Sequence, residues 1–289
     1  MKEKIYICLY AVLAFVMMLF PIFNLFTFIP LVIIYKKSNF KTYMLISVIL
    51  TGLLFVVALS FSSFIPLIVS LIIIKGIEKN INSTNIVLIL AFVVMMLFTA
   101  DFLVVKMNAQ IYSNLVNTLK ITLKDIYAYN ETLNLDDFES FMTQMANFYP
   151  AITFFMGYVS CSLGYYFLNR NFFYKKVDIK DVVKPVSYKF VAIFIGVGFL
   201  IGYLSKSVDI NVYYRIYLIY ANLFIAIFTF LFTQGFIAFN LMMKSRFTKI
   251  VSNILSIVSL FLVLSYLMYF VYGLYLSVVR SIKNEEKFS

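Results

Sequence analysis

The chain has 289 residues, of which 63% are hydrophobic and 13% are charged, and its formal net charge is +11. This composition excludes a disordered chain and a water-soluble globular protein, because a soluble fold could not cover so much apolar surface. Long stretches without a charged residue instead predict an all-α, polytopic transmembrane helix bundle, since a bilayer core about 30 Å thick needs about 20 apolar residues per helix. These stretches are residues 5–35, 42–74, 80–100, 140–169, 190–205, 216–243 and 250–279.

The first stretch predicts a helical hairpin. Residues 5–35 are too long for one straight span and contain Pro21, Asn24 and Pro30. We expect one span to end near Phe20 and a shorter one to cover about 23–35. The N-terminus imitates a signal peptide, but no small-x-small cleavage site follows it, so we interpret it as an uncleaved first span.

The remaining stretches continue this pattern. Residues 42–74 are interrupted by a polar run at 60–63 and by Pro66, which predicts a second hairpin with spans near 42–59 and 64–77. The total is nine spans, with eight as the main alternative. The single spans that follow are expected near 86–105, 148–168, 190–204, 212–243 and 250–279.

The loop charges predict the orientation. With the N-terminus in the cytoplasm, most Lys and Arg fall in cytoplasmic segments, as the positive-inside rule requires for a bacterial cytoplasmic membrane. The basic residues of the C-terminal tail do not fit, because nine spans place them outside. The same rule explains the net positive charge, so nucleic-acid binding is not expected, whereas contact with the lipid bilayer is.

The longest segment outside the predicted spans divides the chain into bundles at 1–105 and 148–289. Residues 106–147 predict an extracytoplasmic amphipathic helix and a second short helix that begins at Asn134 or Asp136. They form either a lid or docking surface, or helices that lie on the membrane, which we favour. The basic loop at 170–189 either binds a partner or anionic lipid, or is a topology determinant, which we also favour.

Four polar side chains in the spans are candidates to line a ligand path, because polar groups are costly inside a bilayer. Asn24 lies in the proline-flanked break, which either binds a ligand or forms a tight turn. Asp101 either coordinates a cation or substrate amine, or faces water near the outer end of its span, which we favour. Gln234 and Asn240 give a late span a polar patch that lines a path or, more often, joins helices by hydrogen bonds.

Two pairs of small residues predict close helix packing. Gly198 and Gly202 form a GxxxG pair, and Ser160 and Gly164 form a second pair at the same spacing. No Ser/His/Asp set, HExxH, nucleotide-binding loop or CxxC occurs, His is absent, and there are two Cys. We therefore expect no enzyme activity, no cofactor and no metal site.

Short motifs occur in an order known from one family. They are Phe28-Ile29-Pro30-Leu31, Phe148-Tyr149-Pro150, Thr233-Gln234-Gly235-Phe236-Ile237-Ala238 and Tyr272-Gly273-Leu274. In this order the chain resembles the YybS-like family of bacterial membrane proteins, which carries a domain-of-unknown-function label. The first six spans of that family are similar to substrate-binding components of energy-coupling-factor transporters, which implies binding of a vitamin or metal ion and separate membrane and ATPase subunits.

Two hypotheses of function follow. The first is a transport-related component that binds a small molecule between the early spans. The second is a non-catalytic membrane scaffold that docks envelope or cell-wall proteins through 106–147 or 170–189. An enzyme acting on lipid-linked substrates has the least support, because no acid–base pair is visible.

Overall fold

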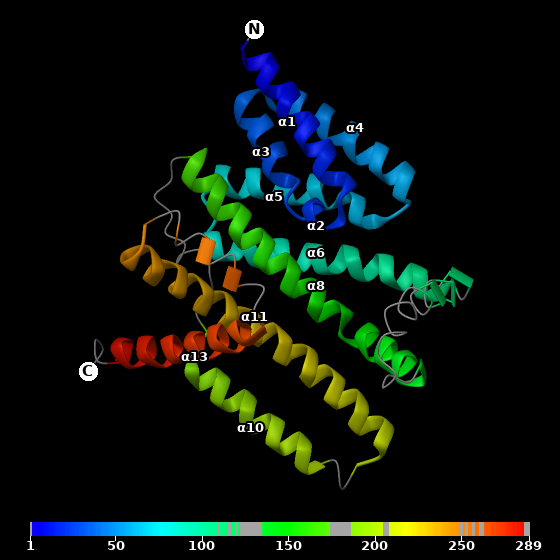
Figure 1. Ribbon diagram of the computed structural model, residues 1–289, viewed down its shortest axis with the longest axis vertical. Coiled ribbons are helices and arrows are strands. Elements are labelled where there is room, and N and C mark those ends of the chain that lie inside the picture. Colours follow the sequence, from blue (N-terminus) through cyan, green and yellow to red (C-terminus); the bar gives the residue numbers. More distant parts are fainter. Residues whose placement is uncertain are drawn as a thin grey trace. The chain divides into compact units, whose positions relative to one another are not determined.

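The computed structural model describes residues 2–108, 135–173, 186–204, 208–248 and 263–285, with isolated positions in 110–121 and 251–259. These parts are helical and contain no strand, which confirms the all-α fold class (Figure 1). The helices form two compact units that interleave along the chain, whereas the predicted division is sequential. Unit 1 comprises Met1–Leu71 and Ala91–Gly157, and unit 2 comprises Ile72–Leu90 and Tyr158–Ser289.

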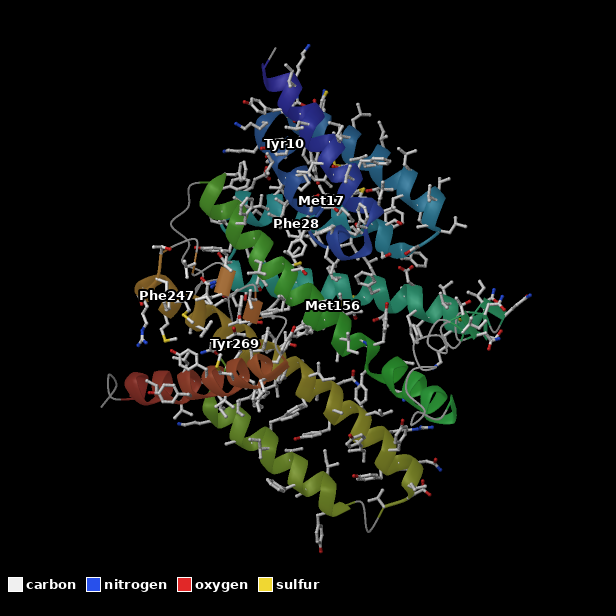
Figure 2. The ribbon with its side chains drawn as sticks, in the orientation of Figure 1. Tyr10, Met17, Phe28, Met156, Phe247 and Tyr269 are labelled. Atoms are coloured by element: carbon white, nitrogen blue, oxygen red, sulfur yellow. The ribbon has the colours of Figure 1, made fainter. Side chains whose placement is uncertain are left out.

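Unit 1 begins with the predicted hairpin. Its elements are α1 (Lys2–Leu19), the one-turn helix α2 (Pro21–Asn24) and α3 (Phe28–Lys37). Pro21 starts α2, where its missing N–H costs no helical hydrogen bond. α3 packs along α1, and Phe28, labelled in Figure 2, is fully buried, as are Leu31 and Ile34. A helix of this size is about 15 Å long, half of a bilayer core, so α3 is shorter than the span predicted at 23–35.

The second hairpin is joined by the polar run that predicts its break. Its elements are α4 (Phe40–Ala58), the 3-10 helix η1 (Phe61–Phe64) and α5 (Ile65–Glu78). Asn39 caps α4, because its Oδ1 accepts a hydrogen bond from the backbone N–H of Thr42 at 2.8 Å. Leu59 ends α4 in the left-handed conformation, with φ 48°. Ser60 then leads directly into η1.

Two long helices follow, α6 (Ser83–Met107) and α8 (Leu135–Asn171). α8 begins where the sequence predicts a short separate helix, but it continues without a break through Pro150 into the predicted span. Membrane helices tolerate an internal proline because other groups take over the freed carbonyl. In unit 1, Gly157 lets α8 approach α6, since a β-carbon there would lie 2.9 Å from Cβ of Val94.

The fully described helices in the last part of unit 2 are α10 (Tyr188–Leu204), α11 (Ile210–Arg246) and α13 (Val263–Glu285). α11 and α13 lie side by side, gold and red in Figure 1. Tyr269 of α13, labelled in Figure 2, is fully buried in an aromatic cluster between these two helices. Its ring contacts Phe232, Phe236 and Phe239 of α11 at centroid distances of 5.3–5.6 Å.

Within the described residues, five helical segments are long and apolar enough to cross a membrane. They are Phe40–Ala58, Phe61–Glu78, Ser83–Met107, Ala146–Asn169 and Ile210–Asn240. Shorter apolar helices in the described residues are Lys4–Leu19, Lys189–Tyr203 and Leu264–Val279. The structure therefore supports a membrane-embedded helical protein. The total of eight or nine spans stays a prediction, and much of 250–262 lies outside the described residues.

Candidate functional site

The inner face of α4 is polar, which is the reverse of a helix in a water-soluble protein. The buried side chains of α4 are Tyr43, Ser47 and Thr51, which lie about one turn apart on a single face. The opposite face is apolar, and Val56, for example, is 73% exposed. Lipid explains this inversion, because apolar side chains face the hydrocarbon while polar ones are kept inside the protein. We call Tyr43, Ser47 and Thr51 the hydroxyl stripe.

One end of the hydroxyl stripe connects α4 to α5. The Tyr43 hydroxyl lies 2.6 Å from Oγ of Ser70. Ser70 also lies 2.9 Å from the carbonyl oxygen of Leu67, which can only accept. A serine hydroxyl has one proton, so Ser70 donates to Leu67 and Tyr43 donates to Ser70. This end of the stripe therefore serves helix packing in unit 1.

Other buried oxygen atoms of unit 1 have no hydrogen-bond partner among the described residues. They include Oγ1 of Thr51 and Oγ of Ser63, whose residues are 2% and 1% exposed. Oδ1 of Asn24, in the break between α1 and α3, is a third. Burying such a group unpaired costs about 1–3 kcal/mol. These oxygen atoms therefore have hydrogen-bonding capacity that the described residues do not use.

Asp101 of α6 holds the link between α4 and α5. Its Oδ1 accepts a hydrogen bond from the backbone N–H of Phe61 at 2.5 Å. Its Oδ2 accepts from the backbone N–H of Ser62 at 2.8 Å and from the hydroxyl of Ser60 at 2.6 Å. Backbone N–H groups at a helix start have no helical partner and favour a negative charge. Both carboxylate oxygens thus accept hydrogen bonds, and Asp101 caps the start of η1.

Gln234 and Asn240 both lie on α11, in unit 2, but they do not form one patch. Six residues along an α-helix correspond to a rotation of about 240°, so the two side chains leave α11 in different directions. Gln234 is 4% exposed, and its Oε1 lies 3.4 Å from Oγ of Ser277 on α13. Ser277 also lies 3.0 Å from the carbonyl oxygen of Gly273. A serine hydroxyl has one proton, so Ser277 can donate fully to only one of these oxygens, and the carbonyl of Gly273 is the nearer. Nε2 of Gln234 has no hydrogen-bond partner among the described residues.

The small-residue pairs differ in their surroundings. A β-carbon on Gly198 would overlap the side chain of Tyr220, so α10 and α11 are close there. A β-carbon on Gly202 would meet nothing within 4 Å. Ser160 and Gly164 are both buried in α8. Of the first pair, Gly198 is therefore the member that a close helix contact requires.

The structure thus places the candidate path residues in two groups. Asn24 and Asp101 belong to unit 1, and Gln234 and Asn240 belong to unit 2. Sequence reasoning missed the hydroxyl stripe, although a signal was present, because Tyr43, Ser47 and Thr51 recur every four residues in an otherwise apolar helix. Ser63 carried no such signal, since its burial depends on how η1 folds against the rest of unit 1.

Other predictions fall largely outside the described residues, including most side chains of the docking segments at 106–147 and 170–189. Within the described ranges no group of three or more His, Cys, Asp or Glu could hold a metal ion. Cys8 is exposed and Cys161 is buried, and neither is in a disulfide.

A scan against protein-family models finds no matching family, and searches of the curated proteins and of the solved structures find no match to this chain.

Proposed function

We propose that this chain is a transport-related, multi-pass protein of a bacterial cytoplasmic membrane that binds a small polar molecule inside unit 1. Its N-terminus lies in the cytoplasm, and it works without catalysing a reaction. The observation that carries the proposal is the set of buried polar side chains in unit 1, namely the hydroxyl stripe, Ser63 and Asn24, several of which have an oxygen atom without a hydrogen-bond partner among the described residues. The resemblance of the early spans to substrate-binding components of energy-coupling-factor transporters points the same way.

Helix packing alone does not account for this interior. Hydroxyls that only join helices pair with each other or with a backbone carbonyl, as Tyr43 and Ser70 do. Thr51 and Ser63 are buried in the same unit with no such partner among the described residues. A bound polar molecule would supply the missing hydrogen bonds and remove the cost of burying these groups.

The chemistry of the buried groups favours binding over catalysis. The buried side chains with polar atoms in the described parts are those of Ser, Thr, Asn, Gln and Tyr, together with the thiol of Cys161 in unit 2. These groups donate and accept hydrogen bonds but do not exchange protons near neutral pH. General acid–base catalysis needs a titratable side chain within hydrogen-bond reach of the substrate. The interior of unit 1 is therefore suited to hold a molecule and not to transform it.

The test compares molecules that co-purify with the protein. Wild-type protein and the Thr51→Val/Ser63→Ala variant are purified in mild detergent. Their small-molecule content is then extracted and identified by mass spectrometry. We expect a polar compound to be retained by the wild type and to be at least about tenfold depleted in the variant, which loses two hydrogen bonds.

The matched control is Thr229→Val in unit 2. The Thr229 hydroxyl is buried and bonds to the carbonyl oxygen of Ile225 in its own helix, at 2.7 Å. This variant should retain the compound at the wild-type level. Equal retention by all three proteins, or no retained compound at all, would mean that unit 1 has no small-molecule site. Circular dichroism of each variant shows that the comparison is made between folded proteins.

A further inference from the structure

The turn between α3 and α4 carries a concentrated positive charge. Lys36 and Lys37 end α3 and Lys41 lies in the first turn of α4, and all three side chains are exposed. Residues 4–77 contain no Asp or Glu, so this part of the chain offers the turn no acidic side chain. Lys41 is also placed at a helix N-terminus, where a positive charge is unfavourable. Lys37 and Lys41 are therefore suited to an anionic partner from outside the chain.

The turn is locally rigid. Ser38 donates its hydroxyl hydrogen to the carbonyl oxygen of Ile34 at 2.7 Å, and Asn39 caps α4. Beside the lysines, the ring of Phe40 packs edge-on against Tyr35 at a centroid distance of 6.5 Å, and it contacts Tyr43 at 6.0 Å. These contacts fix the backbone that carries the lysines.

The turn lies at the edge of the lipid-facing surface. The exposed apolar residues of α4 resume at Leu45, which is 63% exposed. Leu45 is about one helical turn, or 6 Å, from Lys41. Aromatic side chains such as the half-exposed Phe40 gather where hydrocarbon meets headgroups, and lysine side chains extend from that level toward the phosphates. Charge and position together indicate one partner, the headgroups of anionic phospholipids.

We propose that the turn around Ser38, with Lys37 and Lys41 as its principal cations, is a binding site for an anionic phospholipid such as phosphatidylglycerol. The ammonium groups contact the headgroup phosphate, and the apolar face of α4 contacts the acyl chains. This site is separate from the polar interior of unit 1, so it does not depend on the proposed function. Its effect would be to hold this end of the hairpin at the membrane surface.

The chain contains no Trp, which permits a direct test. Phe40→Trp introduces a single tryptophan beside the lysines, at a position that is 44% exposed, and its emission can be excited separately from that of the tyrosines. The full-length variant is reconstituted in phosphatidylcholine vesicles that contain either brominated phosphatidylglycerol or brominated phosphatidylcholine, and fluorescence quenching is measured. We expect the anionic lipid to quench more strongly, by about twofold or more, and the preference to shrink in high salt.

Variants localise the effect. Adding Lys37→Gln/Lys41→Gln to Phe40→Trp should abolish the preference, and adding Lys37→Arg/Lys41→Arg should retain it. Val57→Trp, placed near the other end of α4, should show no preference. The change Lys106→Gln/Arg246→Gln removes the same charge elsewhere and should leave the signal at residue 40 intact. Equal quenching by both lipids at residue 40 would overturn the site. An equal loss of the lipid preference in Lys37→Gln/Lys41→Gln and in Lys106→Gln/Arg246→Gln would also overturn it.

Discussion

Gly235 of α11 and Gly273 of α13 bring their two helices into backbone contact. A β-carbon on Gly235 would overlap the carbonyl oxygen of Tyr269 and would lie 2.9 Å from the backbone nitrogen of Gly273. A β-carbon on Gly273 would in turn overlap the carbonyl oxygen of Leu231. Each glycine thus lies where the backbone of the other helix comes closest to its own. Small residues serve helix contacts in membranes because lipid provides no hydrophobic force between helices, so close packing must supply the attraction.

Gly235→Ala should therefore destabilise unit 2. We expect the free energy of unfolding to fall by about 2 kcal/mol or more, because the new methyl group meets backbone atoms that cannot move aside. The buried thiol of Cys161 can report unfolding through its rate of reaction with maleimide, in a Cys8→Ser background that removes the exposed thiol. Gly196→Ala is the control, since a β-carbon there meets nothing within 4 Å. Equal labelling rates in the two variants would contradict the close crossing.

Asp101→Ala should loosen the link between α4 and α5. The hydroxyl of Ser60 and the N–H groups of Phe61 and Ser62 lose their shared acceptor, at an expected cost of about 1–3 kcal/mol in thermal unfolding followed by circular dichroism. Formate should restore part of this loss, because a small carboxylate fits the space of the removed group. Chloride at equal ionic strength serves as the comparison. Identical effects of the two anions would argue against a carboxylate-specific cap.

Tyr43 and Ser70 should be energetically coupled. In a double-mutant cycle of Tyr43→Phe and Ser70→Ala, we expect a coupling free energy of about 0.5–1.5 kcal/mol, typical of hydrogen bonds between membrane helices. Unfolding in mixed detergent micelles gives the four free energies. Tyr43→Phe combined with Thr229→Val should be additive, because the Thr229 hydroxyl bonds within its own helix. Additivity in the first cycle would show that the 2.6 Å contact contributes nothing to stability.

Gln234→Leu should leave stability unchanged or raise it by up to about 1 kcal/mol. The buried amide is incompletely paired, so an apolar side chain of similar length removes a polar group that is costly to bury. Thermal unfolding of the detergent-solubilised variant measures the change, and Ser277→Ala provides the matching change on α13. A loss above about 2 kcal/mol would indicate that the amide is fully paired in the native membrane.

Helix positions could be predicted from charge alone. α4, α6, α10 and α11 each begin within a few residues of the predicted start, because backbone groups in hydrocarbon must pair within their own helix and charges are excluded from it. The prediction of a short helix separate from the span at 148–168 was wrong, because α8 runs from Leu135 through Pro150 to Asn171 without a break. A proline does not end a helix where other groups pair with the freed carbonyl. The second span was predicted at 23–35, whereas α3 covers Phe28–Lys37.

The sequence by itself determined that this is a helical, membrane-embedded chain, because composition and the spacing of charges set the cost of solvation. Tertiary structure decided which face of each helix is inside. Lipid and the protein interior are about equally apolar, so the periodicity of apolar residues does not mark the buried face of a helix as it does in a water-soluble protein. The partners of Asp101 lie some forty residues earlier in the chain, and Gly235 meets Gly273 on another helix. Such pairs become visible only when the helices are packed.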